Sequence, residues 1–165
     1  MCIRDRWKSG HSVLKAKMKE ERAPIAGELS GHIFFGQDYY GFDDAQYAAV
    51  RLIRALHLIG IGLTQARDRM PPLVNTPELR FQVDPARKAT VVEEVAARLQ
   101  GLDGNEVNRI DGVRVTTPGG WWLLRASNTQ DVLVVRAEAN DHAALARLLA
   151  AVDDQLGRSG VSRAS

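Results

Sequence analysis

The chain has 165 residues, of which 45% are hydrophobic and 25% charged, a composition that is typical of a globular protein and excludes an extended disordered chain. Its net charge of +2 comes from basic residues scattered along the sequence, so composition gives no support for nucleic acid as a partner. The single cysteine, Cys2, excludes an intrachain disulfide, and the longest mainly apolar stretch, 55–63, is far shorter than the roughly 20 residues that span a bilayer.

The first residues carry charges in place of the apolar segment that a signal peptide needs. We therefore expect a cytoplasmic protein that does not associate with membranes. Residues 1–6 follow no periodic pattern, and we expect them to be a leader that is not native to the domain behind it.

The first part of the sequence predicts a helix, a strand and a second helix. A serine opens a Lys-rich helical stretch over 12–22, and residues 27–35 are a short strand-like or loop segment that ends in apolar side chains. The pair Asp43 and Asp44 can cap the second helix, in which apolar residues recur with helical spacing over 45–56.

Glycines, prolines and charges then replace the periodic pattern, as is typical of an interdomain linker, and we place the linker at 67–75. The elements expected beyond it are a strand over 78–83, a helix over 86–101 that stops at Gly101, strands over 108–116 and 121–126, a strand over 132–139, a helix from Asp141, and a tail over 158–165. This β-α-β-β-β-α order predicts a four-stranded antiparallel sheet with two helices on one face, which makes the fold class α+β.

The segment 27–32, with the sequence Gly-Glu-Leu-Ser-Gly-His, is rich in polar groups. On an extended backbone the side chains of Glu28, Ser30 and His32 point to one face. That face suits a polyol, because a carboxylate accepts hydrogen bonds from two neighbouring hydroxyls while serine and histidine add donors. The alternative is a polar loop that leads into the following strand.

A second polar segment lies between two predicted strands. It runs from Arg125 through Ser127, Asn128 and Thr129, and Arg136 follows in the next strand. Hydroxyls and turn amides flanked by guanidinium groups are typical of a phosphate-binding site. Arginine binds phosphate through two hydrogen bonds, and turn amides can bind an anion. The alternative is a turn selected for its backbone preferences, with two arginines on a solvated face.

Together the two segments resemble the α-D-phosphohexomutases of the phosphomannomutase/phosphoglucomutase kind, whose third domain carries a G-E-M-S-G-H sugar loop and whose fourth carries an R-x-S-N-T phosphate loop. Three further segments match family motifs: 8–11 (Lys-Ser-Gly-His) resembles K-T-G-H, 41–44 is G-F-D-D, and 111–114 is D-G-V-R. The resemblance implies that residues 7–66 are the C-terminal part of an incomplete α/β third domain, and that 76–157 are the fourth domain.

The resemblance also implies roles for individual residues. Lys8, Glu28 and Ser30 would bind sugar hydroxyls, while the nontransferring phosphate would be held by Arg125, Ser127, Asn128, Thr129 and Arg136. His11 and His32 would line the cleft as candidate catalytic groups that orient a hydroxyl or carry a proton. Lone histidines are more often structural, which is the alternative for both.

Family members move a phosphoryl group between the 1- and 6-positions of a hexose through a phosphoserine, a hexose 1,6-bisphosphate intermediate and a metal ion, Mg²⁺. No segment here resembles the phosphoserine loop T-A-S-H-N or the metal loop D-G-D-G-D-R. We therefore expect no metal ligands in this chain and an enzyme fragment that is inactive alone and has the N-terminal domains of the same protein as its partners. The alternative is a non-catalytic module that binds phosphosugars.

Several details depart from the family pattern or leave it open. Gln130-Asp131 stands where the family has a residue followed by proline, and Asp131 places a carboxylate near the expected anion.

We expect Trp121 and Trp122 to point to opposite faces, one packed and one exposed. The strands do not suggest the interleaved basic and aromatic residues of a nucleic-acid surface, and mannose, glucose and glucosamine remain equally open as the sugar.

Overall fold

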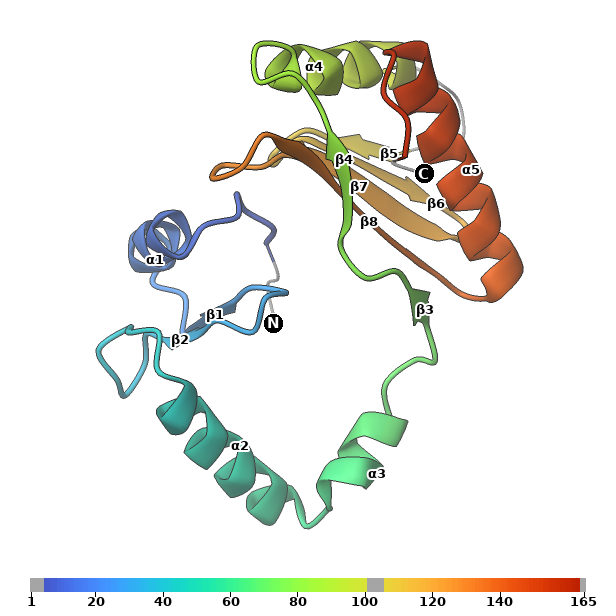
Figure 1. The fold of residues 1–165 in the computed structure, drawn as a ribbon. Helices are drawn as coiled ribbons and strands as arrows, with labels where there is room; N and C mark the ends of the chain where they lie inside the picture. The colour runs from blue at the N-terminus through green and yellow to red at the C-terminus, as the bar shows by residue number, and fades with distance from the viewer. Residues whose placement is uncertain (1–4, 101–105, 164–165) are drawn as a thin grey trace. The chain divides into compact units, whose positions relative to one another are not determined.

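The computed structural model describes residues 5–100 and 106–163 (Figure 1). The chain divides into two compact units, and the boundary along the sequence lies between Pro71 and Pro72. Of the expected leader only residues 5 and 6 are described, while the expected helix stop at Gly101 and the last two residues of the tail lie outside the described ranges. No described helix combines the length and the apolar content that a bilayer span needs.

The described residues of the first unit form three helices and one hairpin, with the following bounds: α1 His11–Glu20, β1 Ile25–Gly27, β2 Ile33–Phe35, α2 Ala45–Ile59 and α3 Leu63–Asp68. β1 and β2 pair antiparallel, with Ile25 opposite Phe35. The expected strand-like segment over 27–35 is therefore the second half of a hairpin, and residues 28–32 form its loop.

The predicted cap of α2 is confirmed. Asp44 is the N-cap and its Oδ1 accepts a hydrogen bond from the Tyr47 amide at 2.9 Å. Gly60 ends the helix at a φ of +73°, a left-handed conformation that glycine adopts without steric cost. Although α2 is amphipathic in sequence, none of its residues is buried, and Val50 and Ile53 are 62% and 68% exposed. The described part of this unit thus leaves one apolar helix face uncovered.

Residues 67–75, where we expected the linker, are partly ordered. α3 extends to Asp68, and β3, Val74–Asn75, joins the sheet of the second unit by pairing with β8. Irregular backbone is limited to residues 69–73 between these two elements.

The second unit is built on an antiparallel sheet with the order β3-β8-β7-β6-β5, and β4 also pairs with β8. Its further elements are β4 Leu79–Gln82, α4 Lys88–Leu99, β5 Glu106–Asn108, β6 Val113–Thr117, β7 Gly120–Ala126, β8 Val132–Ala139 and α5 His142–Arg158. Both helices cover the same face of the sheet, as Figure 1 shows, which confirms the α+β class and the placement of the helices.

The sheet has six strands rather than the expected four. One addition is β3, and the other is β5, because the strand expected over 108–116 is interrupted by a turn at 110–112. Gly112 has a φ of +77°, and a Cβ atom there would lie 2.2 Å from the carbonyl oxygen of Leu124. The turn therefore requires glycine, and it separates β5 from β6.

Alternate residues of the strands pack against α4 and α5. The core of this unit includes Val91 and Val95 from α4, Leu124 and Leu133 from the central strands, and Val152 from α5, all fully buried. Alternation along the strands places the polar residues on the opposite face of the sheet, which is the face that carries the expected phosphate-binding arginines.

Candidate functional site

Three motif segments meet within the first unit. The Glu28 carboxylate, in the loop between β1 and β2, accepts a hydrogen bond from the amide of Gly10 at 2.7 Å through Oε1. Gly10 belongs to the Lys-Ser-Gly-His segment that precedes α1, so this bond fastens that segment to the hairpin loop. The second carboxylate oxygen of Glu28 has no hydrogen-bond partner among the described residues.

The two candidate histidines lie next to each other. The ring centroids of His11 and His32 are 6.5 Å apart, with the planes tilted by 45°. Nδ1 of His32 lies 2.5 Å from Oδ2 of Asp43, which belongs to the Gly-Phe-Asp-Asp segment. We refer to Gly10, His11, Glu28, His32 and Asp43 as the motif cluster.

The geometry of loop 28–32 differs from our expectation. Glu28 donates its amide to the carbonyl oxygen of His32 at 2.9 Å, Gly31 donates to Glu28 at 3.0 Å, and Gly31 has a φ of +95°. The loop is therefore a closed turn, and the prediction of an extended backbone with three side chains on one face is wrong. A polar alternation alone could not separate the two conformations.

The expected sugar-binding residues differ in how the structure places them. Glu28 lies in the motif cluster, whereas Ser30 lies at the exposed tip of the loop and Lys8 is exposed before α1. No hydrogen bond or ion pair joins the side chain of Ser30 or Lys8 to another described residue. These two side chains are thus free to meet a ligand and are not held in advance.

The residue after Asp43 is fixed by an aromatic group. The hydroxyl of Tyr39 donates to Oδ2 of Asp44 at 2.5 Å, and the Tyr39 ring stacks on Tyr47 with centroids 3.7 Å apart. The hydrogen bond from Tyr39 lowers the pKa of Asp44, with a second contribution from the Tyr47 amide, and the same bond raises the pKa of Tyr39. The start of α2 is thereby anchored beside the motif cluster.

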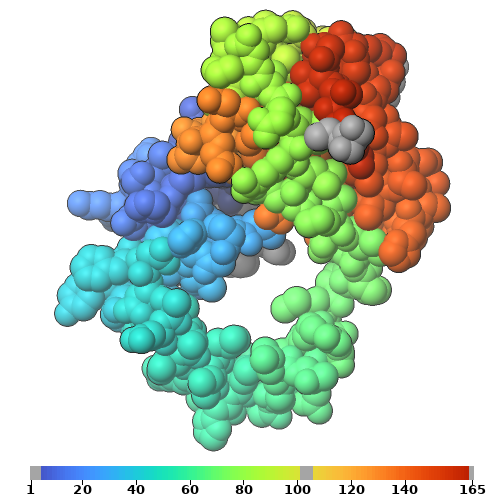
Figure 2. All heavy atoms as spheres, in the orientation of Figure 1, coloured from blue at the N-terminus to red at the C-terminus, as the bar shows by residue number. Residues whose placement is uncertain are grey.

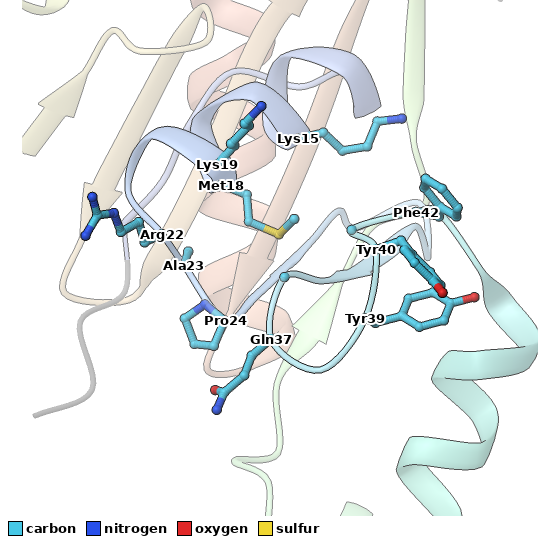
Figure 3. A pocket seen from close by; sticks show the side chains of 12 residues that line it. Lys15, Met18, Lys19, Arg22, Ala23, Pro24, Gln37, Tyr39, Tyr40 and Phe42 are labelled. Atoms are coloured by element: carbon cyan, nitrogen blue, oxygen red, sulfur yellow. The ribbon is translucent and has the colours of Figure 1, made fainter.

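A cavity of about 650 Å³ lies between α1 and residues 36–42, and it is separate from the motif cluster (Figure 3). Met18 points into it, and Tyr39, Tyr40 and Phe42 form one wall. Its basic residues Lys15, Lys19 and Arg22 extend in different directions in Figure 3 and do not converge on one point. None of the residues that sequence analysis proposed for the site lines this cavity.

In the second unit the expected phosphate loop connects β7 to β8. The Ser127 hydroxyl oxygen accepts hydrogen bonds from the amides of Thr129 at 3.4 Å and Gln130 at 3.2 Å, and the Ser127 amide donates to Val132. Ser127 therefore shapes the loop from inside, while the side chains of Asn128 and Thr129 are exposed. Two loop amides already donate to Ser127 and are not available to a ligand. The groups that can still bind an anion are therefore the side chains of Asn128 and Thr129 and the neighbouring cations.

The expected arginines share the face of the sheet that the helices leave open. Arg125 and Arg80 are the two register partners of Val134, and Arg136 follows two residues after Val134 on the same strand. Glu78 contacts two of these cations, Arg80 at 2.9 Å and Arg136 at 3.7 Å. Two of the three guanidinium groups thus lie against one carboxylate, and Arg125 shares their face of the sheet.

Sequence analysis missed two basic residues that hold the loop. Arg80 donates to Oε1 of Gln130 at 2.8 Å, and Lys88 donates to the Gln130 carbonyl oxygen at 2.9 Å. Lys88 also lies 3.4 Å from Oδ1 of Asp131. The carboxylate of Asp131 therefore has its own cation, and the missing proline is replaced by two polar contacts to the loop.

The open face of the sheet carries one further basic–aromatic contact. The Arg114 guanidinium lies over the Trp121 ring, 3.6 Å from its centroid, and Trp121 donates to Glu138 at 2.9 Å. Trp122 is 2% exposed in the core, so the two rings point to opposite faces as predicted, but Trp121 is half-buried rather than exposed. Basic and aromatic residues do share this face, contrary to our expectation, but Arg114 already covers one side of the ring.

The described residues do not fit a divalent metal. No group of three or more His, Cys, Asp or Glu side chains within residues 5–100 and 106–163 is arranged to hold an ion. Asp43 and Asp44, the adjacent carboxylates in the first unit, are bonded to His32 and to Tyr39 and Tyr47. No step of the chemistry is therefore assigned to a metal bound by these residues.

Comparison with known proteins agrees with this division of the chain. A family model described as "Phosphoglucomutase/phosphomannomutase, alpha/beta/alpha domain III" matches residues 4–73, and one described as "Phosphoglucomutase/phosphomannomutase, C-terminal domain" matches residues 78–155. The fold and the motif segments therefore place the chain in the class of proteins in which these two domains follow one another.

Individual relatives show the same correspondence. Phosphomannomutase/phosphoglucomutase of Pseudomonas aeruginosa is 41% identical over 150 residues, which are 91% of this chain and 32% of that protein. Phosphoglucomutase of Neisseria gonorrhoeae is 41% identical over 142 residues, 86% of this chain and 31% of that protein. The X-ray structure of a phosphoglucomutase/phosphomannomutase family protein from Burkholderia thailandensis matches with a TM-score of 0.82 and 40% identity, covering 93% of this chain and 32% of that one.

The chain belongs to the phosphohexomutase family of phosphoglucomutases and phosphomannomutases. It spans about a third of the length of the relatives it matches and corresponds to their C-terminal part.

Proposed function

We propose that this chain is the part of a phosphomannomutase/phosphoglucomutase that recognises the sugar hydroxyls and the nontransferring phosphate of the substrate. The complete enzyme would be a cytoplasmic isomerase that interconverts hexose 1-phosphate and hexose 6-phosphate through a hexose 1,6-bisphosphate. The observation that carries the proposal is the bond between Glu28 and the Gly10 amide, which joins two segments that family members share.

The sugar end would be recognised in the first unit. One oxygen of Glu28 is used to hold Gly10, and the other can accept a hydrogen bond from a sugar hydroxyl. Ser30 and Lys8 add a hydroxyl and an ammonium group that meet no other described residue, so they can bind without breaking an internal contact. His11 and His32 are then the groups able to orient a hydroxyl or accept its proton.

The phosphate would be bound at the β7–β8 loop. Arg125 and Arg136 carry charge that pairs with a phosphate dianion, and guanidinium groups can offer two parallel hydrogen bonds to it. The Asn128 and Thr129 side chains are exposed at the tip and add neutral donors. Ser127 contributes its hydroxyl hydrogen, since its oxygen is engaged with loop amides.

We further propose that residues 7–66 and 76–157 correspond to domains III and IV of the enzyme, joined by a linker at 67–75. Phosphoryl transfer needs an acceptor group and a cation that offsets charge in the transition state. No group of metal-ligating side chains is found among the described residues, and no segment of the sequence resembles the family's phosphoserine loop, so the phosphoserine and the Mg²⁺ ligands would come from the N-terminal domains. The chain alone would bind phosphosugar without turning it over.

A non-catalytic phosphosugar-binding module is the second candidate, and one observation favours it. The second unit has its own continuous core, which includes Leu124, Leu133 and Val152, so it can fold around the phosphate loop without help. Nucleic acid is a weaker ligand class, because the ring of Trp121 is covered by Arg114.

Binding is tested by titrating the ¹⁵N-labelled chain with glucose 1-phosphate and mannose 6-phosphate. We expect amide shifts in residues 127–129 and 28–32, and their loss in Arg125→Gln. Arg147→Gln, a surface change on α5, is the matched control and keeps the shifts. Absence of any shift at millimolar ligand in a folded chain would contradict recognition by this part alone.

Catalysis is tested with a chimaera. Residues 7–157 replace the corresponding C-terminal third of the Pseudomonas aeruginosa relative, and glucose 6-phosphate formation is followed from glucose 1-phosphate. Turnover by the chimaera, with none by the chain alone, supports the enzyme part. Binding by the chain without turnover by a folded chimaera favours the non-catalytic module.

A further inference from the structure

We propose that Asp43 is the positioning residue of His32. Its carboxylate keeps the proton on Nδ1 and so leaves Nε2 as the unprotonated nitrogen that is available to a hydroxyl of the bound sugar phosphate. The role of the hydroxyl rests on the proposed function, whereas the control of the imidazole by Asp43 rests on the geometry of the first unit alone.

The contact itself determines where the proton lies. Nδ1 of His32 and Oδ2 of Asp43 are 2.5 Å apart, and an ionised carboxylate can only accept a hydrogen bond. The bond therefore forms only when Nδ1 carries hydrogen. In a neutral imidazole this leaves Nε2 with its lone pair.

Asp43 is held in place from both sides. Its backbone forms an antiparallel bridge with Phe34, which is fully buried in the small core of the first unit. The next residue, Asp44, is fixed as the N-cap of α2 by the Tyr47 amide and the Tyr39 hydroxyl. The acceptor is thus built into the junction of a strand and a helix, as expected of a group that orients another.

The surroundings of His32 leave Nε2 open. His11 lies on one side, with its centroid 6.5 Å away, and Glu28 belongs to the same loop but directs Oε1 to the Gly10 amide. Within the described residues no group forms a hydrogen bond with Nε2. The imidazole therefore has one nitrogen that is held and one that is free.

This arrangement suits a histidine that accepts a proton. When a sugar hydroxyl at the proposed site gives up its proton, the proton passes from the sugar oxygen to Nε2, and the imidazolium that results keeps its Nδ1–H bond to Asp43. The carboxylate stabilises this positive charge. In the reverse direction Nε2–H returns the proton to the sugar oxygen.

The tautomer of His32 is measured directly. Long-range ¹⁵N–¹H correlation spectra of the chain at about pH 9, well above the ordinary histidine pKa of about 6.5, distinguish Nδ1–H from Nε2–H in each neutral imidazole. We expect His32 to show Nδ1–H, whereas the exposed His57 and His142 serve as internal references. A wild-type His32 that carries its proton on Nε2 would overturn the proposal, whether or not any variant folds.

Asp43→Ala supplies the second comparison. We expect the bias of His32 toward Nδ1–H to be lost, while the amide signals of Phe34 and Tyr47 show that the hairpin and α2 remain folded. Asp68→Ala is the matched control, since it removes a carboxylate that pairs with the adjacent Arg67 and should leave His32 unchanged. An unchanged tautomer in folded Asp43→Ala contradicts the assignment.

Glucose 1-phosphate is then added to the same wild-type sample. A change in the Nε2 resonance supports a hydroxyl at that nitrogen. Loss of phosphosugar binding with the Nδ1–H tautomer intact would count against the proposed function but not against the assignment of Asp43, so the two failures are distinguishable.

Discussion

At the scale of single residues, Lys88 and Asp131 show how a departure from the family pattern is accommodated. Asp131 would place negative charge beside an anion site, yet Lys88 reaches both its carboxylate and the neighbouring Gln130 carbonyl oxygen. The lysine therefore offsets the charge and holds the loop at once. Removing it should matter more than removing an ordinary surface cation.

We predict that Lys88→Met weakens phosphate binding and that adding Asp131→Asn restores it. An exposed ion pair contributes about 0.2–1 kcal/mol, so the dissociation constant for glucose 1-phosphate should rise by up to about fivefold in the single variant. The measurement is the amide titration of residues 127–129 in both variants. Lys15→Met, in the first unit, is the control, and equal weakening in the single and double variants would refute a role for Asp131.

The sequence allowed some of these residues to be predicted and not others. Glu28 and Ser127 lie in short segments with a recognisable order, so their places in the chain could be identified directly. Arg80 and Lys88 are 50 and 42 residues before Gln130. The pairing of β4 with β8 brings Arg80 to the loop, and Lys88 follows at the start of α4. Such contacts depend on sheet register, which a single sequence does not specify.

At the scale of elements, the helices α1, α2, α4 and α5 were predictable because their signals are local, whereas the six-residue α3 was not predicted. Asp44 and Asp141 both accept a hydrogen bond from the amide three residues on, as their positions before periodic apolar segments indicate. The strands β1, β3 and β5 were missed because they contain only two or three residues each, too few to show alternation. They exist because a neighbouring strand offers hydrogen bonds.

Two glycines of the second unit should respond in opposite ways to alanine. Gly112→Ala combines a φ of +77° with a Cβ atom 2.2 Å from a carbonyl oxygen, and left-handed backbone alone costs about 1–3 kcal/mol for a non-glycine residue. Gly157→Ala lies in α5 with open space around it and should gain about 0.5–1 kcal/mol. We expect Gly112→Ala to lower the thermal midpoint by at least about 4 °C and Gly157→Ala to raise it.

Calorimetry of the wild type and both variants checks this pair. Because each change adds the same methyl group, any general effect of alanine cancels between them. A destabilised Gly157→Ala, or a Gly112→Ala as stable as the wild type, would contradict the geometry described for the turn and for α5.

The start of α2 should be sensitive to acid. Hydrogen bonds from Tyr39 and from the Tyr47 amide lower the pKa of Asp44 in the folded state. A carboxylate whose pKa is lowered by folding stabilises the protein above its unfolded-state pKa, and this contribution disappears as the pH falls through the folded-state value. We expect hydrogen-exchange protection of α2 amides to decline over that acid range.

Asp44→Asn provides the comparison, since its side chain does not titrate. Protection of α2 in this variant should be lower at neutral pH and should lose its dependence on pH in the acid range. If the wild type and Asp44→Asn decline in parallel on acidification, another group is responsible.

At the scale of the whole molecule, the two units differ in how completely they bury their apolar residues. The second unit has a continuous core between sheet and helices, whereas α2 of the first unit contains no buried residue. Figure 2 shows the two units as spheres, with the first unit coloured from blue through cyan to green along the chain. We expect the first unit to unfold at lower denaturant concentration.

The uncovered face of α2 gives a prediction that distinguishes the chain from the complete enzyme. In the isolated chain, Ile53→Lys should leave the unfolding midpoint of the first unit within about 0.5 kcal/mol of the wild type, as for other exposed positions, and should reduce self-association in sedimentation experiments. In the chimaera, where the rest of domain III is present, the same change should destabilise the protein.

The outcome depends on whether the missing part of the domain covers Ile53. Arg54→Lys, on the same helix, keeps a charged surface residue and serves as the control in both settings. Equal tolerance of Ile53→Lys in the chain and in a folded chimaera would mean that this face stays exposed in the enzyme.

The carboxylate of Glu78 between Arg80 and Arg136 has a consequence for which ligands the proposed phosphate site would bind. An incoming anion competes with a group that already carries one full negative charge. A monoanion has little advantage in that exchange, whereas a phosphate ester above its second pKa of about 6 brings nearly two charges. The Glu78 carboxylate would thus make the site selective for charge. Doubly ionised phosphate monoesters would bind, whereas phosphodiesters, carboxylates and chloride would not displace Glu78 from the arginines.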